Sequence, residues 1–357
     1  MRFEDVFSTR AASLRIQQDA SNGIAYMARA FFPDDKQMSL ELKNIHAKNG
    51  LGVMLKPSAF DTIATIRTRQ GFTVNSMEMP LFREGFMVTE KDIMDIQRAS
   101  DMNDPYLMAA VRNVYNDAEN LTISAEVAAE MMRCSLMAPI DGNVTISVQA
   151  DNAIYNYDYD PNGTWKATNY VALTGNSRWN QPSTAKPLDD LRTAKQQLEA
   201  NGFDARYAVM NEKTWNYLAD ISQIKNAIVT ISGVSFDFVD DETVRAVFTR
   251  KSGLIPVIYN KKYKNLSGND VNFFPDDYVS VCTSRSLGRT VYAPTPEERT
   301  LLNDPKVDVS IIGAGVALSR QTTYGPPVQN SIYASMIALP SFENMDGMYT
   351  LKVVSAS

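Results

Sequence analysis

The fold is decided by the stretch Thr62-Ile-Ala-Thr-Ile-Arg-Thr-Arg-Gln-Gly-Phe-Thr-Val74, whose side chains alternate as they do along a β-strand. Asn75-Ser-Met-Glu-Met-Pro80 follows as a tip, where proline removes a ladder donor and favours a turn. Leu81-Phe-Arg-Glu-Gly-Phe-Met-Val88 then returns. This pattern predicts a long β-hairpin over residues 57–96 with no core of its own. A lone two-stranded ribbon is marginal in water, so we expect a neighbouring subunit to cover it and the chain to build an assembly.

A long helix is predicted directly after the hairpin. Asp101-Met-Asn-Asp104 supplies capping residues, and Pro105 suits the first helical position. Apolar residues then repeat at four-three spacing, at Leu107, Val111, Val114, Ala118, Leu121, Ala125, Ala128 and Met132. One helix over residues 107–138 would be about 48 Å long. The alternative is an ordinary core helix that is broken near Thr122-Ile-Ser124.

The rest of the chain predicts an N-terminal arm and a mixture of helices and strands. The arm holds a helix from Ser8 or Thr9 through Ala30. A β-hairpin is expected over 142–159, followed by an α/β region from 188 to about 289 with helices over 188–198 and after Asn211. We expect the strands of the α/β region and of the C-terminal part at 205–210, 229–231, 234–239, 254–259, 278–282, 307–312, 335–339 and 349–354.

Composition excludes several classes of function. The 357 residues are 44% hydrophobic and 21% charged, which is typical of a globular chain, and the net charge of -6 comes without a basic patch for sequence-specific nucleic-acid binding. No apolar run is long enough to span a membrane, and the N-terminus lacks the apolar segment of a signal peptide. Two isolated cysteines, Cys134 and Cys282, indicate buried thiols in a reducing compartment. His46, the only histidine, is expected in a polar loop and excludes metal sites that need two histidines.

The order of these segments resembles the major capsid proteins of tailed phages, specifically the lambda-type branch, the phage capsid protein E family. The local patterns that carry the resemblance are Ile66-Arg-Thr-Arg-Gln-Gly71, the run from Trp179 to Pro187-Leu-Asp-Asp190, Ala208-Val-Met-Asn-Glu-Lys-Thr-Trp215, Asn272-Phe-Phe-Pro-Asp-Asp-Tyr-Val279 and Arg285-Ser-Leu-Gly-Arg-Thr-Val-Tyr292. No single pattern is specific, but together they cover roughly residues 50 to 355 in the family's order.

The resemblance implies an α+β fold of the Hong Kong 97 type with five segments. These are an N-terminal arm (1–36), a linker with the extended loop (37–95), a peripheral domain with the spine helix (96–180), an axial domain (181–304) and a return to the peripheral domain (305–357). The implied protein is a major capsid protein of the virion. It would assemble in the host cytoplasm into hexamers and pentamers of an icosahedral shell around double-stranded DNA, without sequence-specific DNA contacts.

The resemblance also implies the partners of the chain. Some relatives carry a scaffolding segment before the arm, for which this sequence has no room, so we expect a separate scaffolding protein or unaided self-assembly. A portal and a decoration protein are further expected partners. Other relatives join subunits covalently through a lysine on the extended loop. Because Lys56 and Lys91 flank the loop and none lies between them, we expect no such cross-link.

Contacts between subunits are expected at the extended loop and the N-terminal arm. Aromatic and methionine side chains would bury against a neighbour or a decoration protein, while charged ones would form intersubunit ion pairs that fix the register. The candidates are Phe31, Phe32, Arg67, Arg69, Phe72, Met77, Met79, Phe82, Arg83, Glu84 and Phe86. The alternative is that the aromatic residues pack on the chain's own body and that the charged residues lie on a solvated strand face.

Catalytic, cofactor and metal sites are not predicted. The acid pairs Asp189-Asp190, Asp240-Asp241 and Asp276-Asp277 lie at turns or helix starts, where capping explains them. Gly313-Ala-Gly315 lacks the further residues of a nucleotide-binding loop, and the basic run Lys261-Lys-Tyr-Lys264 is expected to be a solvated loop. Two alternatives to the capsid interpretation remain: an encapsulin-like compartment around protein cargo and, less favoured, an oligomeric α/β enzyme.

Overall fold

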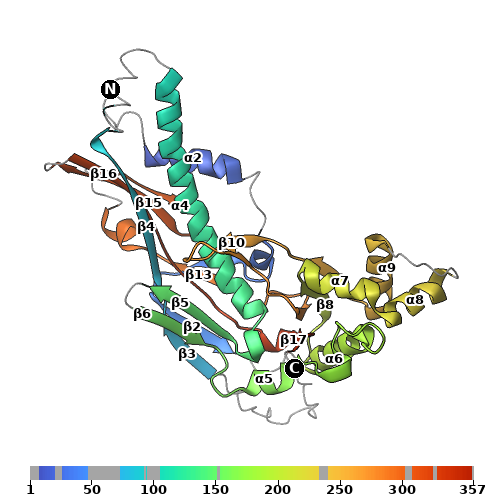
Figure 1. Cartoon of the computed structure of the whole chain (residues 1–357). Helices are drawn as coiled ribbons and strands as arrows, with labels where there is room; N and C mark the ends of the chain where they lie inside the picture. Colours follow the sequence, from blue (N-terminus) through green and yellow to red (C-terminus); the bar gives the residue numbers. More distant parts are fainter. Residues whose placement is uncertain are drawn as a thin grey trace, which may run out of the picture. The chain divides into compact units, whose positions relative to one another are not determined.

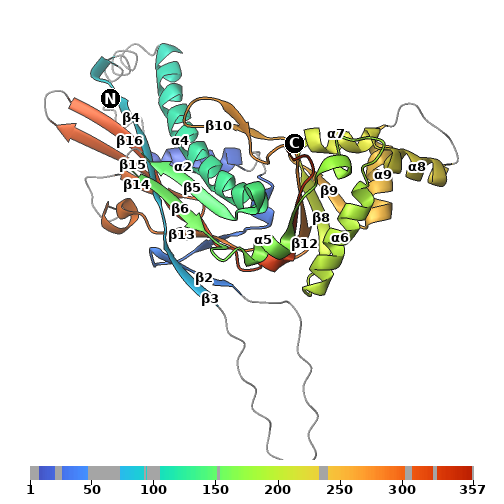
Figure 2. The same ribbon diagram turned by 60° about the horizontal axis from the view of Figure 1, so that its bottom comes forward.

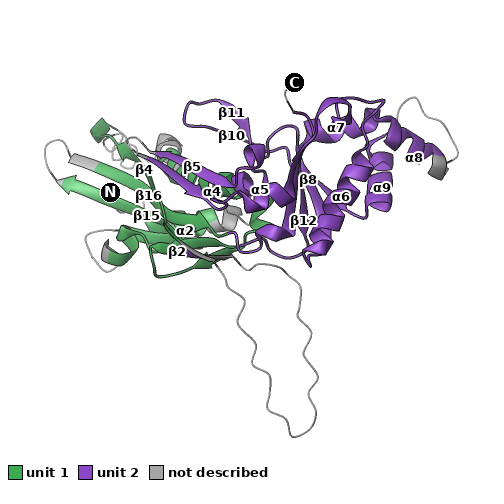
Figure 3. Ribbon diagram, turned by 90° about the horizontal axis from the view of Figure 1, so that it is seen from below, with its two compact units in different colours: residues 1–42, 76–133, 289–341 green, residues 43–75, 134–288, 342–357 purple. Residues whose placement is uncertain are grey.

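The computed structural model describes residues 8–20, 26–46, 73–91, 94, 105–150, 153–232, 240–301, 308–324 and 328–355. They belong to two compact units (Figure 3). Unit 1 comprises residues 1–42, 76–133 and 289–341, and unit 2 comprises residues 43–75, 134–288 and 342–357. These boundaries differ from the five expected segments, most clearly in the C-terminal return, which is divided after residue 341.

Unit 1 is built on a six-stranded sheet. Its order is β1-β13-β16-β15-β14, with β4 also paired to β16 (Figure 1). The strands are β1 (Asp34–Lys36), β4 (Leu81–Val88), β13 (Thr290–Ala293), β14 (Asp308–Ile312), β15 (Val316–Tyr324) and β16 (Val328–Pro340). The helical segments are α2 (Thr9–Ala20), η1 (Ala28–Ala30), the π-helical turn η4 (Glu297–Leu301) and most of α4. The N-terminal helix is thus shorter than the predicted one, which ran to Ala30.

The return strand of the predicted hairpin pairs with the C-terminal part of the chain. In the described part, β4 is antiparallel to β16, from Asn330 opposite Val88 to Ile337 opposite Leu81. The preceding strand β3 (Thr73–Glu78) pairs instead with β2 (Glu41–His46). The prediction of a tip over 75–80 is therefore wrong, because β3 continues to Glu78. The outgoing half of the predicted hairpin, residues 62–72, lies outside the described residues. The ladder between β2 and β3 also places His46 in a strand rather than in a polar loop.

Helix α4 (Pro105–Met137) is continuous over 33 residues, about 50 Å. It begins at Pro105, as predicted, and has no break near Thr122. Thr122 and Ser124 direct their hydroxyl groups to the carbonyl oxygens of Ala118 and Asn120, at 3.1 and 2.9 Å, so both remain compatible with the helix. The predicted apolar stripe is confirmed in part: Val114, Ala118 and Met132 are buried, whereas Leu121, Ala125 and Ala128 are half-buried.

Unit 2 contains a five-stranded sheet of order β7-β17-β12-β8-β9. These strands are β7 (Tyr170–Ala172), β8 (Ala205–Met210), β9 (Ile255–Ile258), β12 (Tyr278–Thr283) and β17 (Met348–Lys352). Figure 2 shows α6 (Pro187–Ala200), α7 (Glu212–Asp220), α8 (Ser222–Ser232) and α9 (Asp241–Ser252) gathered beside β8 and β12. Apolar side chains from the helices and the sheet, such as Leu191, Trp215 and Phe248, form one core.

Smaller elements complete unit 2. They are the paired strands β5 (Thr145–Ala150) and β6 (Ala153–Asp158), the paired strands β10 (Lys262–Lys264) and β11 (Asp270–Asn272), α5 (Thr164–Asn169), and the 3-10 turns η2 (Ile140–Gly142), η3 (Gly175–Ser177) and η5 (Met345–Gly347). The 142–159 hairpin, the strands at 205–210 and 278–282 and the helix capped by Asn211 are confirmed. The strand at 229–231 is wrong, because those residues close α8, and the predicted strand 234–239 lies outside the described residues.

Candidate intersubunit surfaces

Strand β4 presents one edge and part of both faces to solvent. Among the described strands only β16 pairs with it. Phe82 and Phe86, opposite Met336 and Ile332, are half-buried, whereas Leu81 is 46% exposed and Met87 is 56% exposed. An exposed edge without lysine or internal proline is one that proteins usually cover. The outer edge of β4 is therefore available for a contact, although its inner edge belongs to the chain's own sheet.

Arg83 makes its ion pair within unit 1. Its guanidinium contacts Glu297 of η4, and the carboxylate of Glu297 also accepts a hydrogen bond from Ser335 Oγ at 2.8 Å. Glu297 is only 6% exposed, so this pair fixes η4 to β4 and β16. Arg83 thus has an ion-pair partner within its own chain, while its neighbour Glu84 is exposed.

The two aromatic residues of the N-terminal arm are buried in unit 1. Phe31 is 7% exposed and Phe32 is fully buried. Phe32 precedes β1, which adds in parallel to β13, and its carbonyl oxygen accepts a hydrogen bond from Thr290 Oγ1 at 3.0 Å. The expectation that these rings anchor a neighbour is therefore corrected, because unit 1 already covers them.

A buried cation holds the same segment against α4. Arg133 is 3% exposed and pairs with Asp34 at 2.6 Å and with the fully buried Glu130 at 3.5 Å. Arg133 Nε also donates to Thr290 Oγ1 at 2.7 Å, and Glu130 accepts from the Ala28 backbone at 2.9 Å. Charges that are withdrawn from water in this way need all their partners. The network thus ties the chain near residues 28–34 to the helix and to β13.

The other predicted contact residues have mixed outcomes. Met77 is half-buried in β3, and Met79 is 6% exposed, with its backbone N–H bonded to the Leu40 carbonyl at 3.0 Å. Met79 therefore packs within the chain. Arg67, Arg69 and Phe72 lie outside the described residues.

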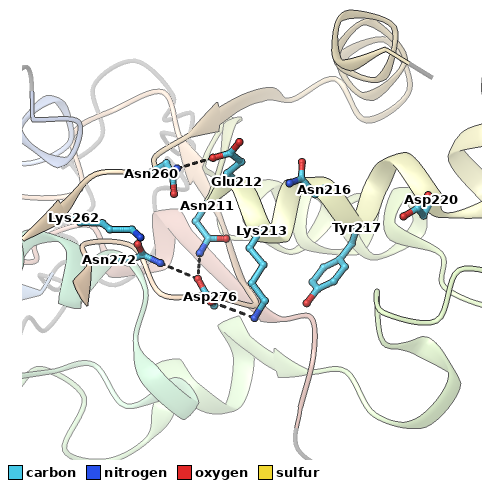
Figure 4. Close-up of a pocket in the computed structure, with 10 residues that line it drawn as sticks. All are labelled: Asn211, Glu212, Lys213, Asn216, Tyr217, Asp220, Asn260, Lys262, Asn272 and Asp276. Carbon is cyan, nitrogen blue, oxygen red and sulfur yellow. Dashed lines mark hydrogen bonds and ion pairs between the residues drawn. The ribbon is translucent and has the colours of Figure 1, made fainter. Parts of the chain in front are cut away.

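A polar hollow of about 540 Å³ lies in unit 2 where β8 and β9 end (Figure 4). Its lining residues are Asn211, Glu212, Lys213, Asn216, Tyr217, Asp220, Asn260, Lys262, Asn272 and Asp276. Asn211 caps α7 by accepting from Thr214 N at 2.9 Å and donates to Asp276, which also pairs with Lys213 at 3.2 Å.

The charge of Lys213 in this hollow is paired with the acids beside it. Partial burial works to lower the pKa of Lys213, but hydrogen bonds to Asp276 and Asp277 outweigh it and raise the pKa above its usual value. Tyr217 donates to Asp277 at 3.0 Å. The pair Asp276-Asp277 is thus engaged in local structure, as is Asp240, which caps α9 through Thr243. Carboxylates held by cations and amides favour a polar contact surface over acid–base chemistry.

The described part of the chain shows neither a reactive cysteine nor a group of side chains placed to bind a metal ion. Cys134 and Cys282 are both buried, and burial raises the pKa of the Cys282 thiol. No group of three or more histidine, cysteine, aspartate or glutamate side chains among the described residues is placed to hold a metal ion. None of the helices searched there is long and apolar enough to cross a membrane.

A family model described as phage major capsid protein E matches residues 17–353. The chain belongs to the phage major capsid protein E family. This confirms the resemblance found in the sequence and makes the chain a phage major capsid protein, a structural protein whose copies form the icosahedral shell of a virion. No curated protein matches the chain.

Solved structures agree with the family in fold. The putative capsid protein of a prophage of E. coli CFT073 is 12% identical, with 98% of this chain and 99% of that chain covered and a TM-score of 0.59. A phage-related protein from Bordetella bronchiseptica RB50 is 12% identical, with coverage of 96% and 98% and a TM-score of 0.52. The capsid of cyanophage A-1(L) is 11% identical, with coverage of 94% and 95% and a TM-score of 0.50. The α+β fold of this capsid protein E is thus of the Hong Kong 97 type, as predicted.

Proposed function

We propose that copies of this chain form the hexamers and pentamers of an icosahedral shell that encloses double-stranded DNA. The observation that carries the proposal is the match of the capsid protein E family across residues 17–353. The role is mechanical, without a catalytic step, and the many weak contacts of a closed shell act together. Assembly takes place in the host cytoplasm, with a separate scaffolding protein, a portal and a decoration protein as partners.

Residues 181–304 surround the five-fold and six-fold axes in this proposal. Support comes from the compact core that α6, α7 and α9 form with β8 and β12. Residues 96–180 and 305–357 form the peripheral part, and the segment 37–95 reaches a neighbouring subunit. The N-terminal arm, residues 1–36, holds its own subunit through β1.

The outer edge of β4 is the proposed contact of the 37–95 segment. Its exposed residues Leu81, Glu84 and Met87 and the half-buried Phe82 and Phe86 would face the neighbour. Met77 of β3 and the predicted contacts Arg67, Arg69 and Phe72 belong to the same proposal. Pairing a strand of another subunit to an open edge supplies main-chain hydrogen bonds, and alternate side chains supply specificity.

DNA is enclosed without sequence-specific contacts. The chain carries a net charge of -6, and its densest basic run includes Lys264, which pairs with Asp270 at 3.0 Å. Affinity for the phosphate backbone needs cations that are free to replace counterions. A shell built from an acidic chain would therefore bind the phosphate backbone of the packaged DNA only weakly.

The test is to purify virions or to co-express the chain with its neighbouring genes, and to examine the particles by negative-stain microscopy and nuclease treatment. The proposal predicts closed shells with ring-shaped capsomers and nuclease-resistant double-stranded DNA inside filled particles. Shells that enclose a protein cargo instead of DNA would contradict the DNA part. A stable monomer or dimer under every condition would contradict shell formation itself.

A further inference from the structure

The β10–β11 hairpin has a tip whose shape is fixed by its own hydrogen bonds. Lys262 pairs with Asn272 and Lys264 with Asp270 across the two strands. At the tip, the Asn265 backbone N–H donates to the Asn269 carbonyl at 2.9 Å, and Asn265 Oδ1 accepts from the backbone N–H groups of Ser267 and Asn269 at 3.1 and 2.9 Å. Gly268 supplies the left-handed backbone conformation that this turn needs, with φ of 80°.

This fixed tip presents one apolar side chain to solvent. Leu266 is 89% exposed, the largest exposed fraction among the large hydrophobic residues of the described part. The base of the hairpin is anchored in unit 2, because the ring of the buried Phe273 lies 4.8 Å from Tyr263 and 6.0 Å from Tyr259, centre to centre. In Figure 3 the hairpin extends from the rest of unit 2. A leucine that the chain holds out rigidly in water loses little conformational entropy when a partner covers it.

The hairpin is basic on an acidic chain. The hairpin and the residue before it, 261–272, contain three lysines and one aspartate, a net charge of +2. Since the whole chain has a net charge of -6, all other residues together have a net charge of -8. Lys264 is paired with Asp270, Lys262 begins β10, and Lys261 precedes it. The hairpin is thus opposite in sign to the net charge of the rest of another copy of the same chain.

We propose that the β10–β11 hairpin is an assembly contact that places Leu266 against the surface of a second copy of this chain. The inference rests on the proposed function, since it assumes that copies assemble, and adds which element docks. Nucleic acid is the less suitable occupant, because the tip side chain is apolar and one of the three lysines is already paired. The contact is heterologous: one hairpin meets a different surface on its neighbour.

The test uses the Leu266→Cys variant and the small thiol reagent N-ethylmaleimide. Both native cysteines are buried, so the introduced thiol is the reactive one in the folded protein. We expect Cys at this position to react rapidly in unassembled protein and at least ten-fold more slowly in assembled shells. Equal rates in the two states would overturn the inference while shell formation stood. Protection that appears only in DNA-filled particles and not in empty ones would also overturn it, since nucleic acid would then be the occupant.

A second measurement compares assembly of Leu266→Ser with that of Ile154→Ser. Ile154 is 71% exposed on β6 of the same unit and serves as the matched control. We expect Leu266→Ser to raise the protein concentration needed for assembly about ten-fold, while the unfolding of the unassembled chain stays unchanged. Ile154→Ser should change the concentration needed for assembly less than two-fold. Wild-type assembly of Leu266→Ser would overturn the inference. If the wild-type chain forms no shells, the proposed function fails. The hairpin contact is then tested separately: a rate of reaction of Leu266→Cys with N-ethylmaleimide that does not change with protein concentration would overturn it.

Discussion

At the residue scale, the most constrained charged side chain of unit 1 is the buried Arg133. Its guanidinium contacts Asp34, Glu130 and Thr290, which come from three segments far apart in sequence. Sequence reasoning did not single out this arginine, because nothing in a helical pattern tells a buried charge from a solvated one. The spacing gives no signal for it, because Arg133 lies beside the predicted apolar stripe and not on it.

Replacing Arg133 by alanine leaves Glu130 buried without its cation. We expect Arg133→Ala to lower the free energy of unfolding by about 3–5 kcal/mol, as measured by denaturant titration. Arg245→Ala is the matched control, since Arg245 forms an exposed pair with Asp241 at 2.7 Å and should lose at most about 1 kcal/mol. Equal losses in the two variants would contradict the network.

Asp190 gives a pH dependence of defined sign. Burial is the main influence on this carboxyl group and raises its pKa, although Trp179 donates a hydrogen bond to it at 3.0 Å. The folded state therefore binds the proton more tightly than the unfolded state, and the wild-type protein loses stability as pH rises from the ordinary aspartate pKa to the raised one.

Asp190→Asn keeps an acceptor for Trp179 and cannot ionise. We expect the unfolding free energy of the variant, relative to that of the wild type, to increase between acidic and neutral pH in a series of urea titrations. Asp189→Asn, in the same helical turn, controls for the loss of one negative charge. A relative stability that stays constant or falls with pH would show that burial does not govern Asp190.

At the scale of elements, the alternating pattern identified strands but not their partners. The prediction placed residues 81–88 against 62–74 because the two segments are close in sequence, whereas in the described part of the chain β4 pairs with β16, about 250 residues later. Gly85 permits this pairing. It lies opposite Tyr333, and a Cβ there would come within 2.3 Å of the tyrosine ring and 2.8 Å of the Ile332 carbonyl oxygen. The aromatic ring covers the glycine, a pairing that only tertiary structure reveals.

Gly85→Ala should therefore separate β4 from β16. We expect a loss of about 1–3 kcal/mol in the free energy of unfolding and faster amide hydrogen exchange along β4, because backbone as well as ring would have to move. Glu84→Ala, one residue away and exposed, should change neither quantity appreciably. If Gly85→Ala folds with wild-type stability and exchange, β4 does not belong to the sheet of unit 1.

One segment of α8 was predicted as a strand because its residue types favour strands. Val229, Thr230 and Ile231 favour strands by propensity, yet they close α8, since Ile224 and Ile228 before them supply the buried helical face. Propensity is a weak guide when a tertiary core decides. Helix α9 was missed for the complementary reason: its mixed charged sequence shows little periodicity, although Asp240 and Gly253 mark its two ends.

At the scale of the whole molecule, the order of elements was predictable and the surfaces were not. The long helix, the 142–159 hairpin and the α/β region were found from periodicity, and their order carried the family resemblance. Of the predicted contact residues, Phe31, Phe32, Arg83 and Met79 are engaged within their own subunit. A sequence shows that an aromatic residue needs burial but not whether its own chain or a neighbour provides it. Leu266 escaped notice because a single leucine in a polar turn has no pattern.

The most direct test of the account is a cryo-electron-microscopy reconstruction of particles assembled from this chain. The account predicts an icosahedral shell in which residues 181–304 surround the five-fold and six-fold axes and the outer edge of β4 meets a neighbouring subunit. A reconstruction of a small closed oligomer, or of a shell with the unit 1 sheet at those axes, would contradict it.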